Sequence, residues 1–190
     1  RSRQRREIEV TSYAEVVLAP PAADALHPAF SNLFVHTEIL RERRAILCTR
    51  RPRSRDEQSP WMLHLVAVHG VEPGEASYET DRLRFLGRTR STAAPLAMRE
   101  CAPLAGSEGS VLGPIVAIRH LVALDPEQVV TIDIVSGVAE TRDLAVSLST
   151  LEPMAASELL PGVGQRIQKL LGGDLVLEDG DLVFVREDGS

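Results

Sequence analysis

Residues 78–88 read Tyr-Glu-Thr-Asp-Arg-Leu-Arg-Phe-Leu-Gly-Arg, which concentrates carboxylates, guanidiniums and aromatic rings in one short stretch. Arginine offers a fixed fork of donors and a carboxylate offers several acceptor sites, so such a cluster can hold sugar hydroxyls or an oxyanion. The alternative is a solvated strand at a sheet edge, whose local ion pairs contribute about 0–1 kcal/mol each. We take these side chains as candidate substrate-binding residues: Tyr78, Glu79, Asp81, Arg82, Arg84 and Arg88.

Within this stretch we expect Arg82 and Arg88 to be held by Glu79 and Asp81, because a guanidinium paired with a carboxylate is already oriented for binding. Gly87 would allow the backbone to turn sharply just before Arg88. The two carboxylates would lie about 7 Å apart on one side of a strand. Glycoside hydrolysis needs carboxylates that flank the scissile bond, so we assign no catalytic residue.

Outward from this stretch, apolar periodicity predicts a mainly β protein. Strands are predicted over residues 8–19, 29–40, 45–49, 61–69, 115–124 and 129–135. Pro20-Pro21 ends the first strand, and Asp125-Pro126 is a turn signal between the last two. Residues 89–114 are rich in Gly, Pro and Ala and predict a long loop. Strands at this spacing favour an antiparallel sandwich.

The pattern changes after residue 140. Residues 141–151 and 154–171 have helical periodicity, with Thr141 or Ser157 as candidate N-caps. Residues 175–185 predict a closing hairpin. We therefore expect a β-sandwich domain over residues 1–150 and a helix plus hairpin tail, of unassigned origin, over residues 151–190.

Composition limits the function classes. The chain has 190 residues and a net charge of −6, which argues against nucleic-acid binding through bulk electrostatics. Its two cysteines, Cys48 and Cys101, are too few for a disulfide framework and wrongly spaced for zinc. His64 and His69 are an odd number of residues apart on one predicted strand, so they point to opposite faces and cannot share a metal. We expect no metal and no cofactor.

Aromatic residues are scarce, at 4% of the chain, so the position of each one is informative. Tyr13, Trp61, Tyr78 and Phe85 could form a platform on which sugar rings stack. The alternative is core packing, which we expect for Trp61 because it begins the most regularly alternating strand.

Three stretches together resemble a known family. They are Glu9-Val-Thr-Ser-Tyr-Ala-Glu-Val-Val-Leu-Ala-Pro-Pro with Asp24-Ala-Leu-His-Pro-Ala-Phe-Ser-Asn-Leu-Phe-Val and Thr37-Glu38; Ala45-Ile-Leu-Cys-Thr-Arg-Arg-Pro-Arg-Ser; and residues 78–88. In this order they resemble the amino-terminal sandwich domain of the glycoside phosphorylase region of cyclic β-1,2-glucan synthases, which is similar to cellobiose and chitobiose phosphorylases. The resemblance covers roughly residues 8–148.

This resemblance implies a partial antiparallel super-sandwich of the galactose mutarotase-like type, of which this chain would be the later part, with a short helical segment at its C-terminal end. In that family the catalytic carboxylate belongs to a following helical barrel. The implied function is therefore a non-catalytic, carbohydrate-binding type of domain in a glycosyltransferase or glycoside phosphorylase.

The implied partners are a β-glucan or oligosaccharide and the helical catalytic barrel, without nucleic acid. Open sheet edges leave a homodimer as a further alternative. The implied location is the cytoplasmic side of the inner membrane, as a soluble segment of a larger membrane-bound protein. Two other functions stay open: an independent carbohydrate-binding module, and a structural or oligomerisation fragment without a ligand.

Overall fold

The computed structural model describes residues 4–52, 59–72, 74–99 and 102–149, together with the backbone of β9 (Gly173–Glu178) and β10 (Asp181–Arg186). The chain divides into two units, Arg1–Thr150 and Leu151–Ser190. In the second unit β9 and β10 form an antiparallel pair. The helix predicted over residues 154–171 lies outside the described residues.

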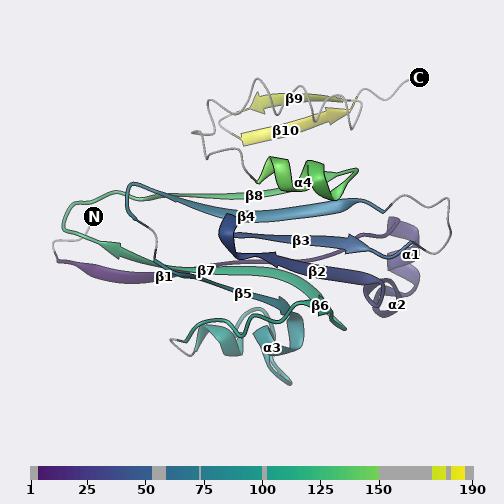
Figure 1. Ribbon diagram of the computed structural model, residues 1–190, viewed down its shortest axis with the longest axis horizontal. Coiled ribbons are helices and arrows are strands. Elements are labelled where there is room, and N and C mark those ends of the chain that lie inside the picture. Colours follow the sequence, from purple (N-terminus) through teal and green to yellow (C-terminus); the bar gives the residue numbers. More distant parts are fainter. Residues whose placement is uncertain are drawn as a thin grey trace. The chain divides into compact units, whose positions relative to one another are not determined.

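The first unit alternates strands with short helices, as Figure 1 shows. Its elements are β1 (Arg6–Glu15), α1 (Pro21–Leu26), α2 (Pro28–Asn32), β2 (Val35–Leu40), η1 (Arg41–Arg43), β3 (Ala45–Arg50), β4 (Trp61–His69), β5 (Ala76–Asp81), α3 (Arg82–Leu86), η2 (Leu96–Met98), β6 (Gly109–Ser110), β7 (Pro114–Leu124), β8 (Thr131–Ala139) and α4 (Arg142–Leu148).

Two antiparallel sheets form the layers of this unit. A three-stranded sheet has the order β1-β7-β5, and a five-stranded sheet has the order β6-β2-β3-β4-β8. The connection at Asp125-Pro126 carries the chain from β7 in the first sheet to β8 in the second. The predicted mainly β, antiparallel sandwich is confirmed.

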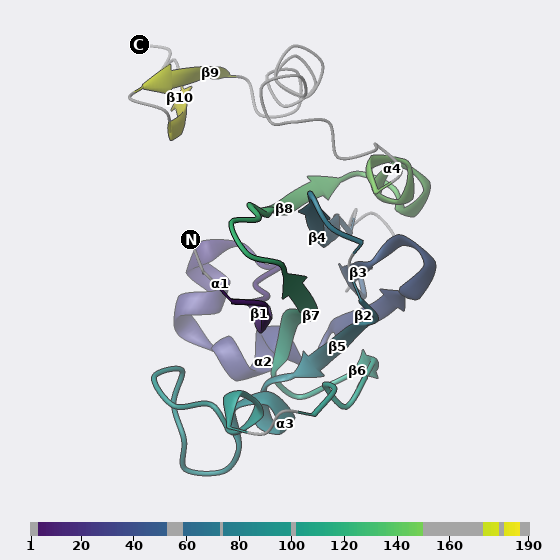
Figure 2. The ribbon, with the colours of Figure 1, turned by 90° about the vertical axis from the view of Figure 1, so that its left-hand side faces the viewer.

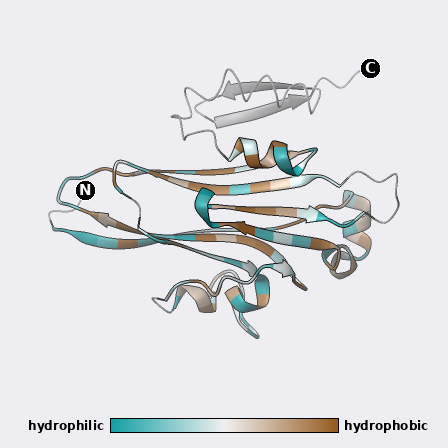
Figure 3. Cartoon of the chain, viewed as in Figure 1, coloured by the Kyte–Doolittle hydropathy of each residue, from teal (hydrophilic) through white to brown (hydrophobic). Residues whose placement is uncertain are grey.

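Alternation along the strands places one set of side chains between the sheets. Figure 3 shows how apolar and polar residues interleave along the strands. The central cluster takes side chains from both sheets: Val16, Val35, Ile39, Ile46, Cys48, Val66, Tyr78, Val116 and Ile118. Cys48 is fully buried among them, as an apolar strand position predicts, and burial raises the pKa of its thiol to about 12.

The outer face of the five-stranded sheet is covered by α4. Thr141 caps this helix by accepting a hydrogen bond from the Leu144 backbone N–H, as predicted. Trp61 is half-buried here and packs with Leu47, Leu63 and Ala145. Its ring therefore has a packing role, but beneath the helix rather than between the sheets.

The outer face of the three-stranded sheet is covered by α3 and part of residues 87–108. Phe85 and Leu86 of α3 pack on Ile115 and Ala117 of β7. Tyr13 stacks against Phe85 with ring centroids 5.0 Å apart. Gly87 ends α3 with φ of +84°, which confirms the predicted sharp turn before Arg88.

The prediction of a strand over residues 29–40 is wrong in its first half. Pro21 and Pro28 each stand at the start of a helix, where the fixed φ of proline and its missing N–H cost nothing. The apolar residues that suggested a strand, such as Phe30, lie on α2, and strand structure begins at Val35. Among the described residues, no helix is long and apolar enough to cross a membrane.

Candidate functional site

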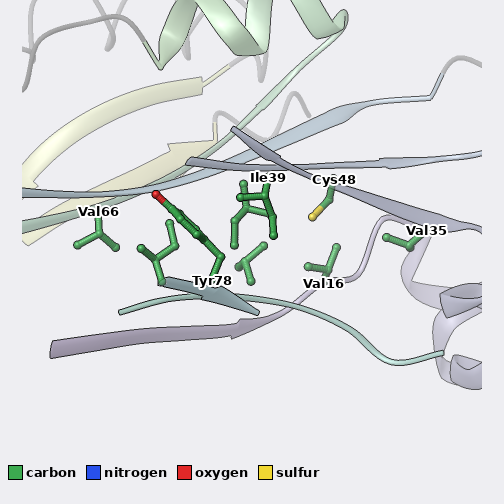
Figure 4. Close-up of a cluster of buried hydrophobic side chains, with 9 residues drawn as sticks. Val16, Val35, Ile39, Cys48, Val66 and Tyr78 are labelled. Atoms are coloured by element: carbon green, nitrogen blue, oxygen red, sulfur yellow. The ribbon is translucent and has the colours of Figure 1, made fainter. Parts of the chain in front are cut away.

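The six predicted site residues separate onto different faces of β5 and α3. Tyr78 points inward and is buried in the central cluster, where Figure 4 shows it together with Ile39 and Val66. Burial raises the pKa of its phenol. Tyr78 is therefore a core residue and does not join an outward-facing cluster, because its place on the strand gives it the opposite face from its neighbour Glu79.

Glu79 points to the outer face, yet its side chain is 1% exposed because α3 and the following loop cover it. Its Oε1 atom accepts hydrogen bonds from the backbone N–H groups of Thr80 (2.9 Å) and Asp81 (2.8 Å). Its Oε2 atom is buried and has no hydrogen-bond partner among the described residues. A buried carboxylate oxygen without a partner costs about 1–3 kcal/mol or more, so this acceptor remains unsatisfied within the described part of the chain.

Arg82 does not form the predicted ion pair with Glu79 or Asp81. Asp81 Oδ1 instead accepts from the Leu83 backbone N–H at 2.8 Å and starts α3. The helix start turns Arg82 toward β1, where its Nε donates to Glu15 Oε1 at 2.9 Å. The Arg82 hydrogen bond lowers the pKa of Glu15. The predicted pairing of Arg82 with Glu79 and Asp81 is therefore wrong, because the start of α3 directs the Arg82 guanidinium to Glu15.

Arg84 and Arg88 are exposed. Arg84 borders the same hollow as Glu79. Arg88 follows Gly87 in the loop, and no ion pair is found for it within the described part of the chain. Of the predicted set, Glu79 and Arg84 are the two that the fold brings to one cavity.

This cavity, which we call the α3 cavity, has a volume of about 120 Å³. Its walls are Glu79, Arg84, Phe85, Leu96, Ala97, Ala102, Pro103, Leu104 and Ala105. It therefore offers a carboxylate acceptor and a guanidinium donor within mostly apolar walls. Apolar walls with a few polar groups are the usual composition of small-molecule sites in proteins.

Arg119 is the residue that sequence reasoning missed. It lies on β7 and is 4% exposed. Its guanidinium donates to the carbonyls of Ala97 (2.6 Å) and Ala102 (2.7 Å) and to Thr11 Oγ1 (3.0 Å). It thereby ties one wall of the α3 cavity to the sheet. A charged residue inside the apolar run 115–122 was the signal that could have revealed it.

The two strand histidines lie on opposite faces of β4, as predicted. His64 faces the other sheet and hydrogen-bonds to Ser12 (2.9 Å) and Ser136 (2.7 Å), whereas His69 pairs with Asp133 at 3.0 Å. Burial lowers the pKa of His64 to about 4. The described residues contain no group of three or more side chains that could hold a metal ion.

The aromatic platform considered above does not form. Tyr78 and Phe85 are buried in two different clusters, and Trp61 belongs to a third. Tyr13 is half-buried against Phe85 and donates its hydroxyl to Glu15. These four rings therefore share no surface on which a sugar could stack.

Two facing antiparallel sheets with helices on their outer sides define a β-sandwich domain. Residues 1–150 match the family described as glycosyl hydrolase 94, supersandwich domain, and the chain belongs to this family. The resemblance inferred from the three sequence stretches is thereby confirmed.

Part of this sequence is also similar to one curated protein. The cyclic beta-(1,2)-glucan synthase NdvB of Rhizobium meliloti (strain 1021) is 44% identical to this chain over 117 residues, which is 62% of the chain. The aligned part is 4% of the length of that protein. The chain thus represents a supersandwich domain homologous to a small part of a much larger synthase.

Proposed function

We propose that this chain is a non-catalytic, sugar-contacting supersandwich domain of a glucan-processing enzyme, and that the α3 cavity is where it meets the glucan. The proposal rests on two residues that line one cavity. Glu79 has a buried oxygen without a partner among the described residues, and Arg84 has a guanidinium. The similarity to a protein named as a cyclic β-1,2-glucan synthase supports a β-glucan as the ligand.

In this proposal Glu79 Oε2 accepts a hydrogen bond from a sugar hydroxyl and Arg84 donates one to a neighbouring oxygen. Each charge-assisted bond contributes about 1.5–3 kcal/mol net. Two of them give a dissociation constant on the order of millimolar. Arg88, which is exposed on the same loop, would contact a longer glucan outside the cavity.

The catalytic step would belong to another part of the enzyme. Glycoside cleavage needs a positioned general acid beside the leaving oxygen. Glu79 is already bound by two backbone N–H groups on one oxygen and lies in a small cavity. We propose that the domain packs beside a helical catalytic barrel, within a membrane-bound enzyme and on its cytoplasmic side.

A glucan titration tests the binding part of the proposal. We expect a short linear β-1,2-glucan to shift the amide resonances of residues 79–86 and 102–105, with an affinity in the millimolar range. The Arg84→Met variant should bind about tenfold more weakly, whereas Arg43→Met, an exposed arginine of η1, should bind like the unmodified chain. Shifts spread over the whole surface, or equal binding by both variants, would overturn the proposal.

A phosphorolysis assay tests the non-catalytic part. The purified chain should release no sugar phosphate from a β-1,2-glucan in the presence of inorganic phosphate. Phosphate-dependent release that disappears in a Glu79→Gln variant would show that the chain itself carries the reaction.

A further inference from the structure

The α3 cavity has its two polar side chains at different depths. Glu79 is 1% exposed on β5, beneath α3 and the loop that follows it, whereas Arg84 is exposed on α3 itself. Figure 2 shows α3 and this loop on the side of β5 and β7 that faces away from β3 and β4. The carboxylate therefore lies at the inner end of the cavity, and the guanidinium lies at its mouth.

The inner end of the cavity accepts hydrogen bonds and does not donate them. Glu79 Oε1 already receives the N–H groups of Thr80 and Asp81, and Oε2 has no partner in the part of the chain that the structure describes. An ionised carboxylate has only acceptor sites. The group that satisfies Oε2 is therefore a donor, which is either a neutral hydroxyl or a cation such as an ammonium.

The charges at the cavity favour the neutral donor. The Arg84 guanidinium at the mouth supplies one positive charge for the one negative charge of Glu79. An ammonium group would have to pass Arg84 and would add a second positive charge between mostly apolar walls, where repulsion between like charges is stronger than in water. A hydroxyl makes the same hydrogen bond without this repulsion.

The volume of the cavity selects which hydroxyl of a sugar can reach Glu79. About 120 Å³ is room for about four water-sized groups, and it is below the range of about 300–1,000 Å³ that is usual for sites that enclose a whole small ligand. Hydroxyls attached directly to a sugar ring reach the inner end only if the ring itself enters. A hydroxymethyl group extends beyond the ring on its own carbon, so it can enter alone, with its methylene against Phe85, Leu96 and Leu104.

We propose that the α3 cavity recognises the hydroxymethyl group of one glucosyl unit, through its free primary hydroxyl. This inference rests on the proposed function, since it names the part of the glucan that enters the site. The primary hydroxyl donates to Glu79 Oε2, and Arg84 donates to an oxygen of the ring that stays at the mouth. A sugar without this hydroxyl leaves the buried Oε2 acceptor unpaired and binds more weakly for that reason.

A matched series of methyl β-glycosides tests this inference. The series contains methyl glucoside, its 6-deoxy analogue, its 6-amino-6-deoxy analogue and methyl xyloside, which lacks the hydroxymethyl group altogether. The readout is the shift of the amide resonances of residues 79–86 and 102–105. We expect the glucoside to bind at least about tenfold more tightly than the 6-deoxy analogue and the xyloside, and at least as tightly as the amino analogue.

Two alanines of the loop after α3 supply matched variants. Ala105 lines the cavity and Ala94 does not, and both are exposed. Ala105→Leu fills part of the cavity, so it should bind the glucoside as weakly as the xyloside. Ala94→Leu adds the same side chain outside the cavity and should keep the tenfold preference for the glucoside. The amide spectrum of each variant without sugar shows whether its fold is intact.

The outcomes separate this inference from the proposed function. Equal binding of the glucoside and its 6-deoxy analogue, tighter binding of the amino analogue, or a preference that Ala105→Leu retains would overturn the inference. If the linear β-1,2-glucan still shifts the amides of residues 79–86 and 102–105 in any of these cases, the proposed function stands without it. A failure of both the glucan and the methyl glycosides to shift these amides would overturn both.

Discussion

The polar groups buried at the two faces of the three-stranded sheet differ in how completely they are hydrogen-bonded. On the inner face, Ser12 bonds to His64 of the facing sheet, whose other ring nitrogen bonds to Ser136, and Thr80 meets Thr37 across the layers. On the outer face, Arg119 donates hydrogen bonds to Thr11, Ala97 and Ala102 and lies 3.9 Å from a carboxylate oxygen of Glu9. Glu79 uses one of its two carboxylate oxygens, and the other has no partner among the described residues. A buried group that makes all of its hydrogen bonds joins the layers together. A buried group beside a cavity that makes only half of them has an acceptor left for a ligand.

The largest expected effect concerns the outer face. Replacing Arg119 by Met should destabilise the fold by about 3 kcal/mol, because the carbonyls of Ala97 and Ala102 lose their donors. Urea denaturation measures this change, and Arg88→Met, which alters an exposed arginine, should stay within about 0.5 kcal/mol. If Arg119→Met proves as mild as Arg88→Met, the outer layer is not tied down by this residue and the comparison between the faces fails.

On the inner face we expect a pH dependence of nearly the same size. The pKa of His64 is about 4 in the fold, and its ordinary value is 6.5. Between these values the unfolded chain binds a proton and the folded chain does not. The free energy of unfolding should therefore fall by roughly 3 kcal/mol as the pH falls from 6.5 to 4.

Urea titrations at pH 7 and pH 4.5 should show this loss, and His64→Gln should remove most of it. His120 is also buried, and burial lowers its pKa, so part of the slope should persist in the variant. An unchanged slope in His64→Gln would mean that burial of this ring is not the source of the pH dependence.

The smallest expected effect lies at the rim of the outer face. Arg82 and Glu15 are each about half exposed, so solvent screens their ion pair. Arg82→Met should cost at most about 1 kcal/mol in a thermal melt. The pKa of Glu15, now lowered by the Arg82 hydrogen bond, should rise toward its ordinary value in an NMR titration. A large loss of stability would show that this pair is a structural clamp rather than a surface contact.

The sequence predicted the regular parts of the fold because they depend on local alternation. The strand predicted over residues 61–69 coincides with β4, and the Thr141 cap was found from its residue type and position. Residues 29–34 were misassigned to a strand, although Phe30, Leu33 and Phe34 follow the i, i+3, i+4 spacing of a helix. There, the prolines decide the outcome.

The partners of the candidate site residues could not be predicted from the sequence. Of residues 78–88, Glu79, Arg84 and Phe85 line the α3 cavity. The partner of Arg82, however, is Glu15, a residue 67 positions away on β1, and no local rule connects them. Arg119 reaches its partners through the strand order β1-β7-β5, which a single sequence does not reveal.

The most direct test of the account is a Glu79→Gln substitution with two measurements. Glutamine keeps a carbonyl oxygen for the N–H groups of Thr80 and Asp81 and replaces the open Oε2 acceptor by a donor. We expect a change in the free energy of unfolding of less than about 1 kcal/mol and at least tenfold weaker binding of the linear β-1,2-glucan. Glu75→Gln, an exposed carboxylate just before β5, serves as the control and should change neither quantity. A Glu79→Gln variant that loses stability and binds glucan like the unmodified chain would contradict the account.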